Sequence, residues 1–324
     1  TFPSCYYFYK SWIPVSEKTV MVSTILSGGE ILSFSICGSL VNTPMELMGF
    51  SVGGWPACFC IFDMSGIVWF PLWMTYGYEV PEDHPYMNPK ELAFIRKDSV
   101  ACSIINDTDD NLKEVARRIP WGHFIRDPVS LTLLYAYFTM SFIGFMSLSE
   151  IPSFLTAELN FDIDEAGFLS VAPFFAQLVS AIGFGQLFNF LQQNHGWSVS
   201  NVRQASQFIC FGGSATCLVI CGFMTNVAAA VSFLVFALFF FGATQSGLAC
   251  SFLDVSPNYS CSLNSLANLV GAIAGILAPL VVTAFTYLWP GAAGWQAVFI
   301  FTGALCMLAL YFWRRYRPCE VVPW

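Results

Sequence analysis

The sequence predicts an all-α, polytopic membrane protein, and three features of the chain lead to this expectation. Of the 324 residues, 56% are hydrophobic and only 10% are charged, whereas about a quarter of the residues in an ordinary soluble domain are charged. Apolar runs recur along the chain, and about 20 helical residues span the hydrocarbon core of a bilayer. The basic residues fall only between certain of these runs. A spanning β-barrel would instead show short alternating strands, so we expect helices.

Eight apolar runs have the length of a spanning helix, and a polar stretch separates the first two from the other six. We place these runs at 20–43, 56–77, 129–152, 167–190, 206–224, 227–250, 262–286 and 295–316. The polar stretch is rich in charged residues, and we expect one short helix in it, near Pro89–Lys97. The predicted regions are therefore 1–77 with two spanning helices, a central loop at 78–128, a six-helix part at 129–317 and a tail at 318–324.

The basic residues support this division, because all of them fall on one side of the predicted membrane. They are Lys10, Lys18, Lys90, Arg96, Lys97, Lys113, Arg117, Arg118, Arg126, Arg203, Arg314, Arg315 and Arg317. The loops on the other side contain no Lys or Arg, and their charged residues are Glu46, Glu158, Asp162, Asp164 and Glu165. Loops rich in Lys and Arg stay in the cytosol. We therefore expect the central loop and both ends of the chain to be cytosolic.

Other classes of protein lack support in the sequence. The net charge of −8 comes from carboxylates in loops, and no basic surface suits nucleic acid. The chain has no Gly-rich phosphate loop, zinc-binding spacing or nucleophile motif. Most of its 12 Cys lie within apolar runs, where Cys acts as a small hydrophobic residue. We expect no enzymatic activity, no cofactor and no metal site.

Two helices, a large cytosolic loop and six more helices suggest part of a larger arrangement. Four additional helices before Thr1 would complete two six-helix halves, which is the layout of a major facilitator transporter. The eight helices would then be equivalent to helices five to twelve, and Thr1–Tyr9 would be the end of the fourth. On this interpretation the chain is truncated at its N-terminus.

Short motifs along the chain support a closer resemblance. They include Trp12 with Pro14 and Glu17, Tyr78–Glu79 with Pro81 and His84–Pro85, Leu253–Pro257 with Tyr259, Asn268 with Gly271, Gly275 and Pro279, and Trp295–Gln296. In this order, the motifs resemble the anion:cation symporter family of the major facilitator superfamily. That family contains vesicular glutamate transporters, sialin and relatives of the sodium–phosphate cotransporters.

The resemblance implies a secondary active transporter for small organic anions or phosphate, working by alternating access. Transport would be coupled to a Na⁺ or H⁺ gradient or to the membrane potential. The alternative is a transport-inactive, truncated membrane protein with an interaction role. Met140, Asn189 and Phe252 motivate this alternative, because they stand where members of the family have an arginine, an acidic residue and a histidine. The substrate, the coupling ion and the membrane remain open.

Four polar residues within the predicted helices are candidates for a substrate or ion pathway. Glu30 is near the middle of the first helix, where a charge costs roughly 2.5–3.5 kcal/mol. Asn264 and Asn268 are four residues apart and share a helix face. Gln245 lies in a Gly-containing part of the sixth helix, beside Thr244 and Ser246. The alternative is a structural role: Glu30 as a protonated carboxyl group, and the amides as interhelical contacts worth about 0.6 kcal/mol each.

Four further residues are candidates for a structural or conformational role. Gly271 and Gly275 have the small-xxx-small spacing that permits close packing of helices, and they would also let the helix bend. Asp254 lies at a predicted cytosolic helix end, where it would cap the helix or pair with Arg203 to latch one conformation. Arg314, Arg315 and Arg317 are expected to anchor the last helix among anionic head groups.

Overall fold

The computed structural model contains seven helices that are long and apolar enough to cross a membrane, among the residues that it describes. The described residues are 8–9, 11–14, 21, 36, 40, 46–47, 50–51, 54–97, 119–158, 163–256 and 259–319. The seven helices coincide with seven of the eight predicted runs. The remaining run, 20–43, lies almost entirely outside the described residues, as does Glu30. The all-α membrane architecture is confirmed, with seven spans found.

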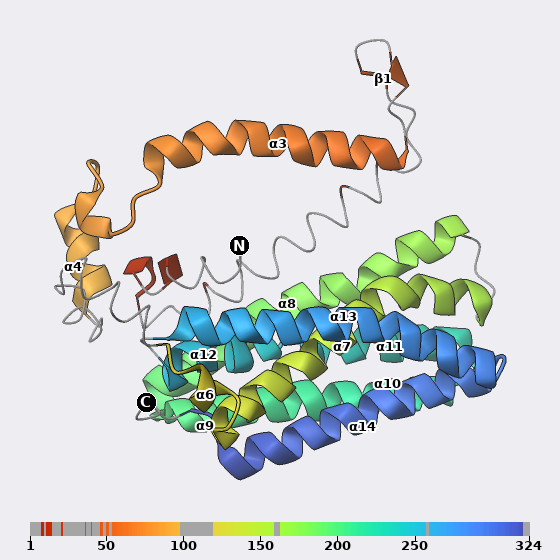
Figure 1. The fold of residues 1–324 in the computed structure, drawn as a ribbon. Coiled ribbons are helices and arrows are strands. Elements are labelled where there is room, and N and C mark those ends of the chain that lie inside the picture. The colour runs from red at the N-terminus through yellow and green to blue at the C-terminus, as the bar shows by residue number, and fades with distance from the viewer. Residues whose placement is uncertain are drawn as a thin grey trace.

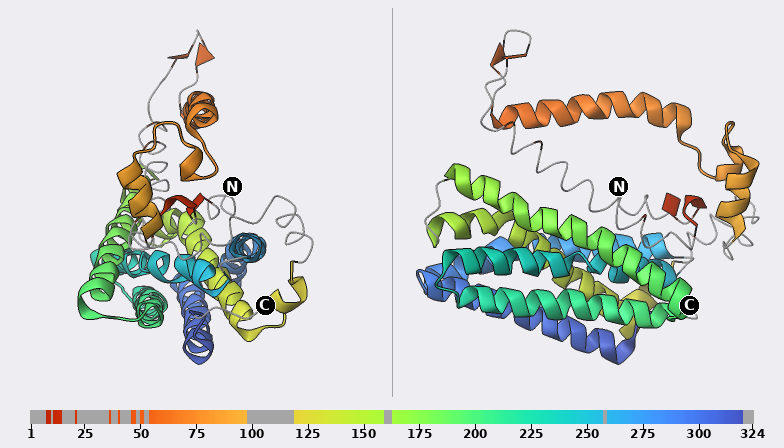
Figure 2. Two further views of the ribbon diagram at one scale, coloured as in Figure 1. Left: turned by 90° about the vertical axis from the view of Figure 1, so that its left-hand side faces the viewer. Right: turned by 180° about the vertical axis from the view of Figure 1, so that it is seen from behind.

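The first described spanning helix, α3 (Trp55–Tyr76), follows a small antiparallel pair of strands, β1 (Glu46–Leu47) and β2 (Phe50–Ser51). Gly54 adopts a positive φ of 81° immediately before α3, and a proline occupies the first turn, where its missing N–H costs no hydrogen bond. α3 lies apart from the bundle formed by the later helices (Figures 1 and 2). Most of its apolar side chains are exposed, and lipid is the environment that accepts such a surface.

The described residues of the polar stretch after α3 form three short helices. They are η1 (Pro81–Asp83), α4 (Pro89–Lys97) and α6 (Trp121–Phe124). The helix expected near Pro89–Lys97 is therefore present, whereas residues 98–118 lie outside the described part. Arg96 of α4 donates a hydrogen bond of 2.6 Å from Nε to Glu82 of η1, and this contact joins the two short helices.

Six passes form a bundle after the polar stretch. They are α7 (Pro128–Ala157), α8 (Ile163–His195), α9 (Val199–Gln207) continued by η3 (Phe208–Gly213) and α10 (Ser214–Gly222), α11 (Val227–Phe241) followed by η4 (Gln245–Ala249) and α12 (Cys250–Val255), α13 (Ser260–Leu288), and α14 (Ala292–Tyr316). Both η3 and η4 are π-helical, so two of the six passes depart locally from regular α-helix.

Side-chain caps explain where several of these helices begin. The carboxylate of Asp127 accepts a hydrogen bond from the backbone N–H of Ser130, at 2.9 Å, at the start of α7. Ser198 caps α9 and Asn226 caps α11 in the same manner. Such caps satisfy N–H groups that have no partner within the helix. Short turns join the passes, and successive passes run in opposite directions (Figure 1).

The bundle is held together by an extensive contact between α7 and α13, and by contacts of α10 with α14 and of α11 with α8 and α10. Large aromatic side chains fill its interior, among them Phe142, Phe211, Phe299 and Trp313, each no more than 2% exposed. The alternating passes bring α4, α6, the start of α9 and the C-terminus to one end of the molecule (Figure 1). The described basic residues therefore gather at that end.

Candidate functional site

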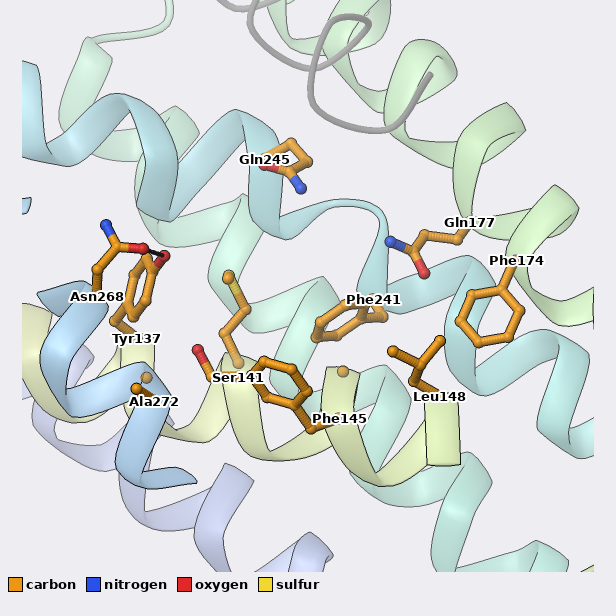
Figure 3. A pocket seen from close by; sticks show the side chains of 13 residues that line it. Tyr137, Ser141, Phe145, Leu148, Phe174, Gln177, Phe241, Gln245, Asn268 and Ala272 are labelled. Atoms are coloured by element: carbon orange, nitrogen blue, oxygen red, sulfur yellow. Dashed lines mark hydrogen bonds between the residues drawn. The ribbon is translucent and has the colours of Figure 1, made fainter. Parts of the chain in front are cut away.

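A cavity of about 410 Å³ lies between four passes of the bundle. Its wall comes from α7, α8, α11, η4 and α13, and Figure 3 shows its side chains. The lining residues are Tyr137, Met140, Ser141, Gly144, Phe145, Leu148, Phe174, Gln177, Phe241, Gln245, Asn268, Gly271 and Ala272. A volume of this size suits a small organic molecule.

One polar group of the cavity is a hydrogen-bonded pair between α7 and α13. The hydroxyl of Tyr137 donates to Oδ1 of Asn268 at 3.0 Å, and Nδ2 of Asn268 donates to the carbonyl of Asn264 at 2.9 Å. The Asn268 amide is thus held in one orientation by groups on both sides. A fixed amide and hydroxyl at a cavity wall can orient a polar ligand without rearranging first.

Two further amides face the cavity from other elements. Gln177 of α8 is 4% exposed, and Gln245 of η4 is 7% exposed. Both side chains extend into the cavity in Figure 3, Gln177 near Phe174 and Gln245 from another side. Gln245 begins the π-helical turn, and turns of this kind are frequent at functional sites because they redirect a side chain. Primary amide N–H groups can donate hydrogen bonds to a carboxylate or phosphate oxygen.

Close helix packing at glycines shapes this wall. A Cβ atom on Gly271 would lie 2.7 Å from Oγ of Ser141 and 2.8 Å from a ring carbon of Tyr137. A Cβ atom on Gly275 would lie 3.0 Å from the ring of Phe145. Both glycines therefore let α13 approach the cavity-lining side chains of α7. Their small-xxx-small spacing is used for close packing in this structure.

A buried ion pair lies close to the cavity, toward the basic end of the bundle. Nε of Arg203 in α9 donates to Oδ2 of Asp254 in α12 at 2.9 Å, and its Nη1 donates to the carbonyl of Ser246 at 2.5 Å. Arg203 is 3% exposed. The expected partner of Asp254 is therefore present. The guanidinium group ties α9 to the π-helical turn that carries Gln245.

Only some of the predicted site residues line the cavity. Gln245, Asn268 and Gly271 line the cavity, whereas Asn264 is 1% exposed and does not line it. The side-chain amide of Asn264 has no hydrogen-bond partner among the described residues. Thr244 and Ser246 are also buried outside the lining.

Sequence reasoning missed the contributions of α7 and α8 to the cavity. Tyr137, Ser141 and Gln177 are polar residues in otherwise apolar runs, and that signal marks each of them in the sequence. Gly242 was also missed. A Cβ atom there would lie 2.0 Å from Oγ of Ser180 and 2.5 Å from the carbonyl oxygen of Gln177, so glycine is needed for this approach of the α11–η4 region to α8.

No group of three or more His, Cys, Asp and Glu side chains that could hold a metal ion occurs in the part of the chain that the structure describes. Among the described residues that line the cavity, Tyr137 is the one ionisable side chain. This part of the lining is suited to binding through hydrogen bonds and apolar contacts.

Comparison with known proteins identifies transporters as relatives. The chain is 27% identical over 325 residues to vesicular glutamate transporter 1 of Xenopus tropicalis, covering 100% of this chain and 54% of that protein. It is 26% identical over 325 residues to vesicular glutamate transporter 2 of Homo sapiens, with the same coverage. The chain thus spans about half the length of these curated relatives.

A solved structure and a family model also match. A bacterial homologue of the iron transporter ferroportin, in an outward-facing state, aligns with a TM-score of 0.47 and 13% identity over 97% of this chain and 86% of that chain. A model of the Major Facilitator Superfamily matches residues 1–279. Because this match covers most of the chain, the protein belongs to the Major Facilitator Superfamily, whose members are membrane transporters and not enzymes.

Proposed function

We propose that this chain forms the larger part of a secondary active transporter that moves small organic anions or phosphate by alternating access. The observation that carries the proposal is the cavity of about 410 Å³ inside the six-pass bundle, with amides facing it from separate elements. Gln177, Gln245 and Asn268 belong to α8, η4 and α13 respectively, so a bound anion would contact three passes at once. A ligand held by several passes can favour one arrangement of them over another.

The proposed transport also needs a driving force. With the basic end of the bundle in the cytosol, an anion that crosses the membrane moves through the electrical field, which is worth about 2.3 kcal/mol per charge at 100 mV. A Na⁺ or H⁺ gradient is the other driving force. The Arg203–Asp254 pair connects α9 to α12 beside the cavity, and in our proposal it stabilises one of the two access states.

The proposal is tested by transport in proteoliposomes. The purified full chain is reconstituted, and uptake of labelled glutamate, phosphate and monocarboxylates is measured under imposed Na⁺, pH or potential gradients. We expect gradient-dependent uptake of at least one anion. Gln245→Leu should reduce it, because the variant removes an amide from the cavity wall. Gln193→Leu is the matched control, since Gln193 is exposed near the end of α8. Absence of gradient-dependent flux for every anion would refute the transporter proposal.

The exposed surface of α3 favours an interaction role as the second candidate. Ile67, Val68 and Met74 are each 66–68% exposed, and a long apolar helix of this kind can pack against another membrane helix. In that case the reconstituted chain would move no anion. Crosslinking from α3 in native membranes would instead capture a specific membrane protein.

A further inference from the structure

We infer that the transported anion is a monocarboxylate with an aromatic or bulky apolar body, rather than a compact anion with several charges. This inference rests on the proposed transport function and names its substrate class. It follows from what the described passes place around the cavity: much apolar surface, several neutral hydrogen-bond donors and no charged side chain.

The apolar surface of the cavity comes from three passes. Phe145 and Leu148 of α7 face Phe174 of α8 and Phe241 of α11 across the space shown in Figure 3. Phe145 is 45% exposed and Leu148 is 43% exposed, so an apolar ligand can cover much of both side chains. Aromatic rings contact other rings favourably, either edge to face or offset. A phenyl-sized group is therefore a suitable occupant of this part of the cavity.

The α7 side of the cavity is polar at one end and apolar at the other, and Gln177 of α8 lies beside Phe174 at the apolar end (Figure 3). Along α7, the lining begins with Tyr137 and Ser141 and continues with Phe145 and Leu148, which lies three turns, or about 16 Å, further along the helix. The hydrogen bond between Tyr137 and Asn268 places the α13 amide at the polar end as well. A ligand with a carboxylate at one end and an apolar body at the other matches this gradient.

The charge of the described lining residues argues against a compact anion with several charges. No Lys, Arg, His, Asp or Glu side chain is found among the described residues that line the cavity. An anion with two charges, or a zwitterion such as glutamate, would lose hydration on entry and meet only neutral groups on this wall. A single carboxylate needs fewer donors, and the two N–H bonds of the Gln245 amide, together with the hydroxyl of Ser141, can supply them.

The test is a binding series with the purified full chain in nanodiscs. The probes are phenylacetate, acetate, glutamate and inorganic phosphate, together with benzyl alcohol, which has the aromatic ring but no charge. We expect phenylacetate to bind at least about tenfold more tightly than acetate, because apolar pockets discriminate strongly even between single methylene groups. Phenylacetate should also exceed benzyl alcohol, since the carboxylate uses the amide donors.

Two variants test whether the ligand binds in the cavity. Phe145→Ala should weaken phenylacetate binding about tenfold and leave acetate binding unchanged. Phe236→Ala is its matched control, because Phe236 is 53% exposed on α11 and does not line the cavity. Met140→Arg adds a cation to the neutral wall, and it should strengthen binding of glutamate or phosphate relative to phenylacetate.

The outcomes separate this inference from the proposed function. If glutamate or phosphate binds or is transported and phenylacetate does not compete, the substrate class is wrong while the transporter proposal stands. If phenylacetate binds no better than benzyl alcohol, or if Phe145→Ala has no effect, the inference also fails, since partition into lipid then explains the signal. If no anion binds and none is transported, both proposals fail together.

Discussion

Arg203 is the one charged side chain that is buried among the residues described by the structure. Its guanidinium group is satisfied by the Asp254 carboxylate and by the Ser246 carbonyl. Asp254 is more accessible, with 18% of its side chain exposed. Loss of the acid therefore leaves a buried cation without its counter-charge, whereas loss of both partners removes the problem.

Asp254→Asn should destabilise the protein by about 3 kcal/mol, the lower part of the range for breaking a buried ion pair. The double variant Arg203→Gln/Asp254→Asn should recover part of this loss, because no uncompensated charge remains. Thermal unfolding followed by a thiol-reactive dye measures both, since Cys210, Cys221 and Cys306 are buried until the helices separate. Arg96→Gln is the control, because its exposed pair with Glu82 is worth about 0–1 kcal/mol. Equal effects of Asp254→Asn and Arg96→Gln would contradict this prediction.

Glu82 provides a pH-dependent contact outside the spanning helices. Partial burial by itself raises the pKa of Glu82, but the hydrogen bond and charge of Arg96, with a backbone hydrogen bond, outweigh burial and lower the pKa below its usual value of 4.5. An acid with a lowered pKa in the folded state stabilises that state above its unfolded pKa. The contribution is lost as the pH falls through the folded pKa.

The contact between η1 and α4 should therefore weaken below pH 4.5. Hydrogen exchange of α4, compared between the wild type and Glu82→Gln at matched pH, measures this change. At pH 6 the variant should exchange faster in α4, and the difference between the two proteins should shrink as the pH falls below 4.5. Equal exchange of the two proteins in α4 at pH 6 would show that ionisation of Glu82 does not support the contact.

At the scale of helices, glycines determine how closely the passes approach, and their neighbours determine the cost of replacing them. A methyl group on Gly271 meets the side chains of Ser141 and Tyr137, which can move. A methyl group on Gly242 meets the carbonyl oxygen of Gln177 at 2.5 Å and the backbone nitrogen of Ala181 at 2.9 Å. Backbone cannot move without shifting a whole helix.

Gly242→Ala should consequently destabilise the bundle more than Gly271→Ala. We expect Gly242→Ala to lower the free energy of unfolding by about 1–3 kcal/mol relative to wild type, as overpacking does in other protein interiors. Thermal unfolding in nanodiscs compares the two. Gly183→Ala is the control on α8, because nothing lies within 4 Å of the added methyl group, and it should be neutral or stabilising. A ranking in which Gly271→Ala is the more damaging would mean that the α8–α11 approach adapts easily.

At the scale of the whole molecule, the alternating passes gather the described basic residues at one end, where α4 and the C-terminus lie (Figure 1). Arg314 and Arg315 occupy the last turn of α14, where cations also interact favourably with the helix dipole. The opposite end carries the turn between α13 and α14. This separation of charge is what a fixed orientation in a membrane requires.

Lys90, which is exposed on α4, should react with a membrane-impermeant amine reagent only after right-side-out vesicles are permeabilised. Ala293→Lys introduces a lysine in the exposed first turn of α14, at the opposite end, and that lysine should react in intact vesicles. Mass spectrometry of the modified peptides compares the two positions. Modification of Lys90 in intact vesicles would reverse the proposed orientation.

Much of the fold was predictable from local composition, and part of the site was not. The helices α7 to α14 lie where apolar runs predict them, although several extend beyond the predicted limits. The fifth predicted run starts at 206, for example, whereas α9 begins at Val199, where Ser198 caps it. Gln245 and Asn268 were predicted for the pathway and line the cavity, whereas Asn264, on the same helix face as Asn268, does not. The role of Glu30 stays a prediction.

The sequence alone determined that the chain crosses a membrane as helices, because lipid offers no partners to the backbone and each apolar run must satisfy its own N–H and C=O groups. Local composition is sufficient for that conclusion. The tertiary structure decided that Tyr137 meets Asn268, which the sequence did not predict, and that Asp254 takes the pairing with Arg203 out of the two roles that the sequence left open. A spanning helix carries polar residues both at buried helix contacts and at a cavity wall, so its sequence does not separate Asn264, which is buried, from Asn268, which lines the cavity.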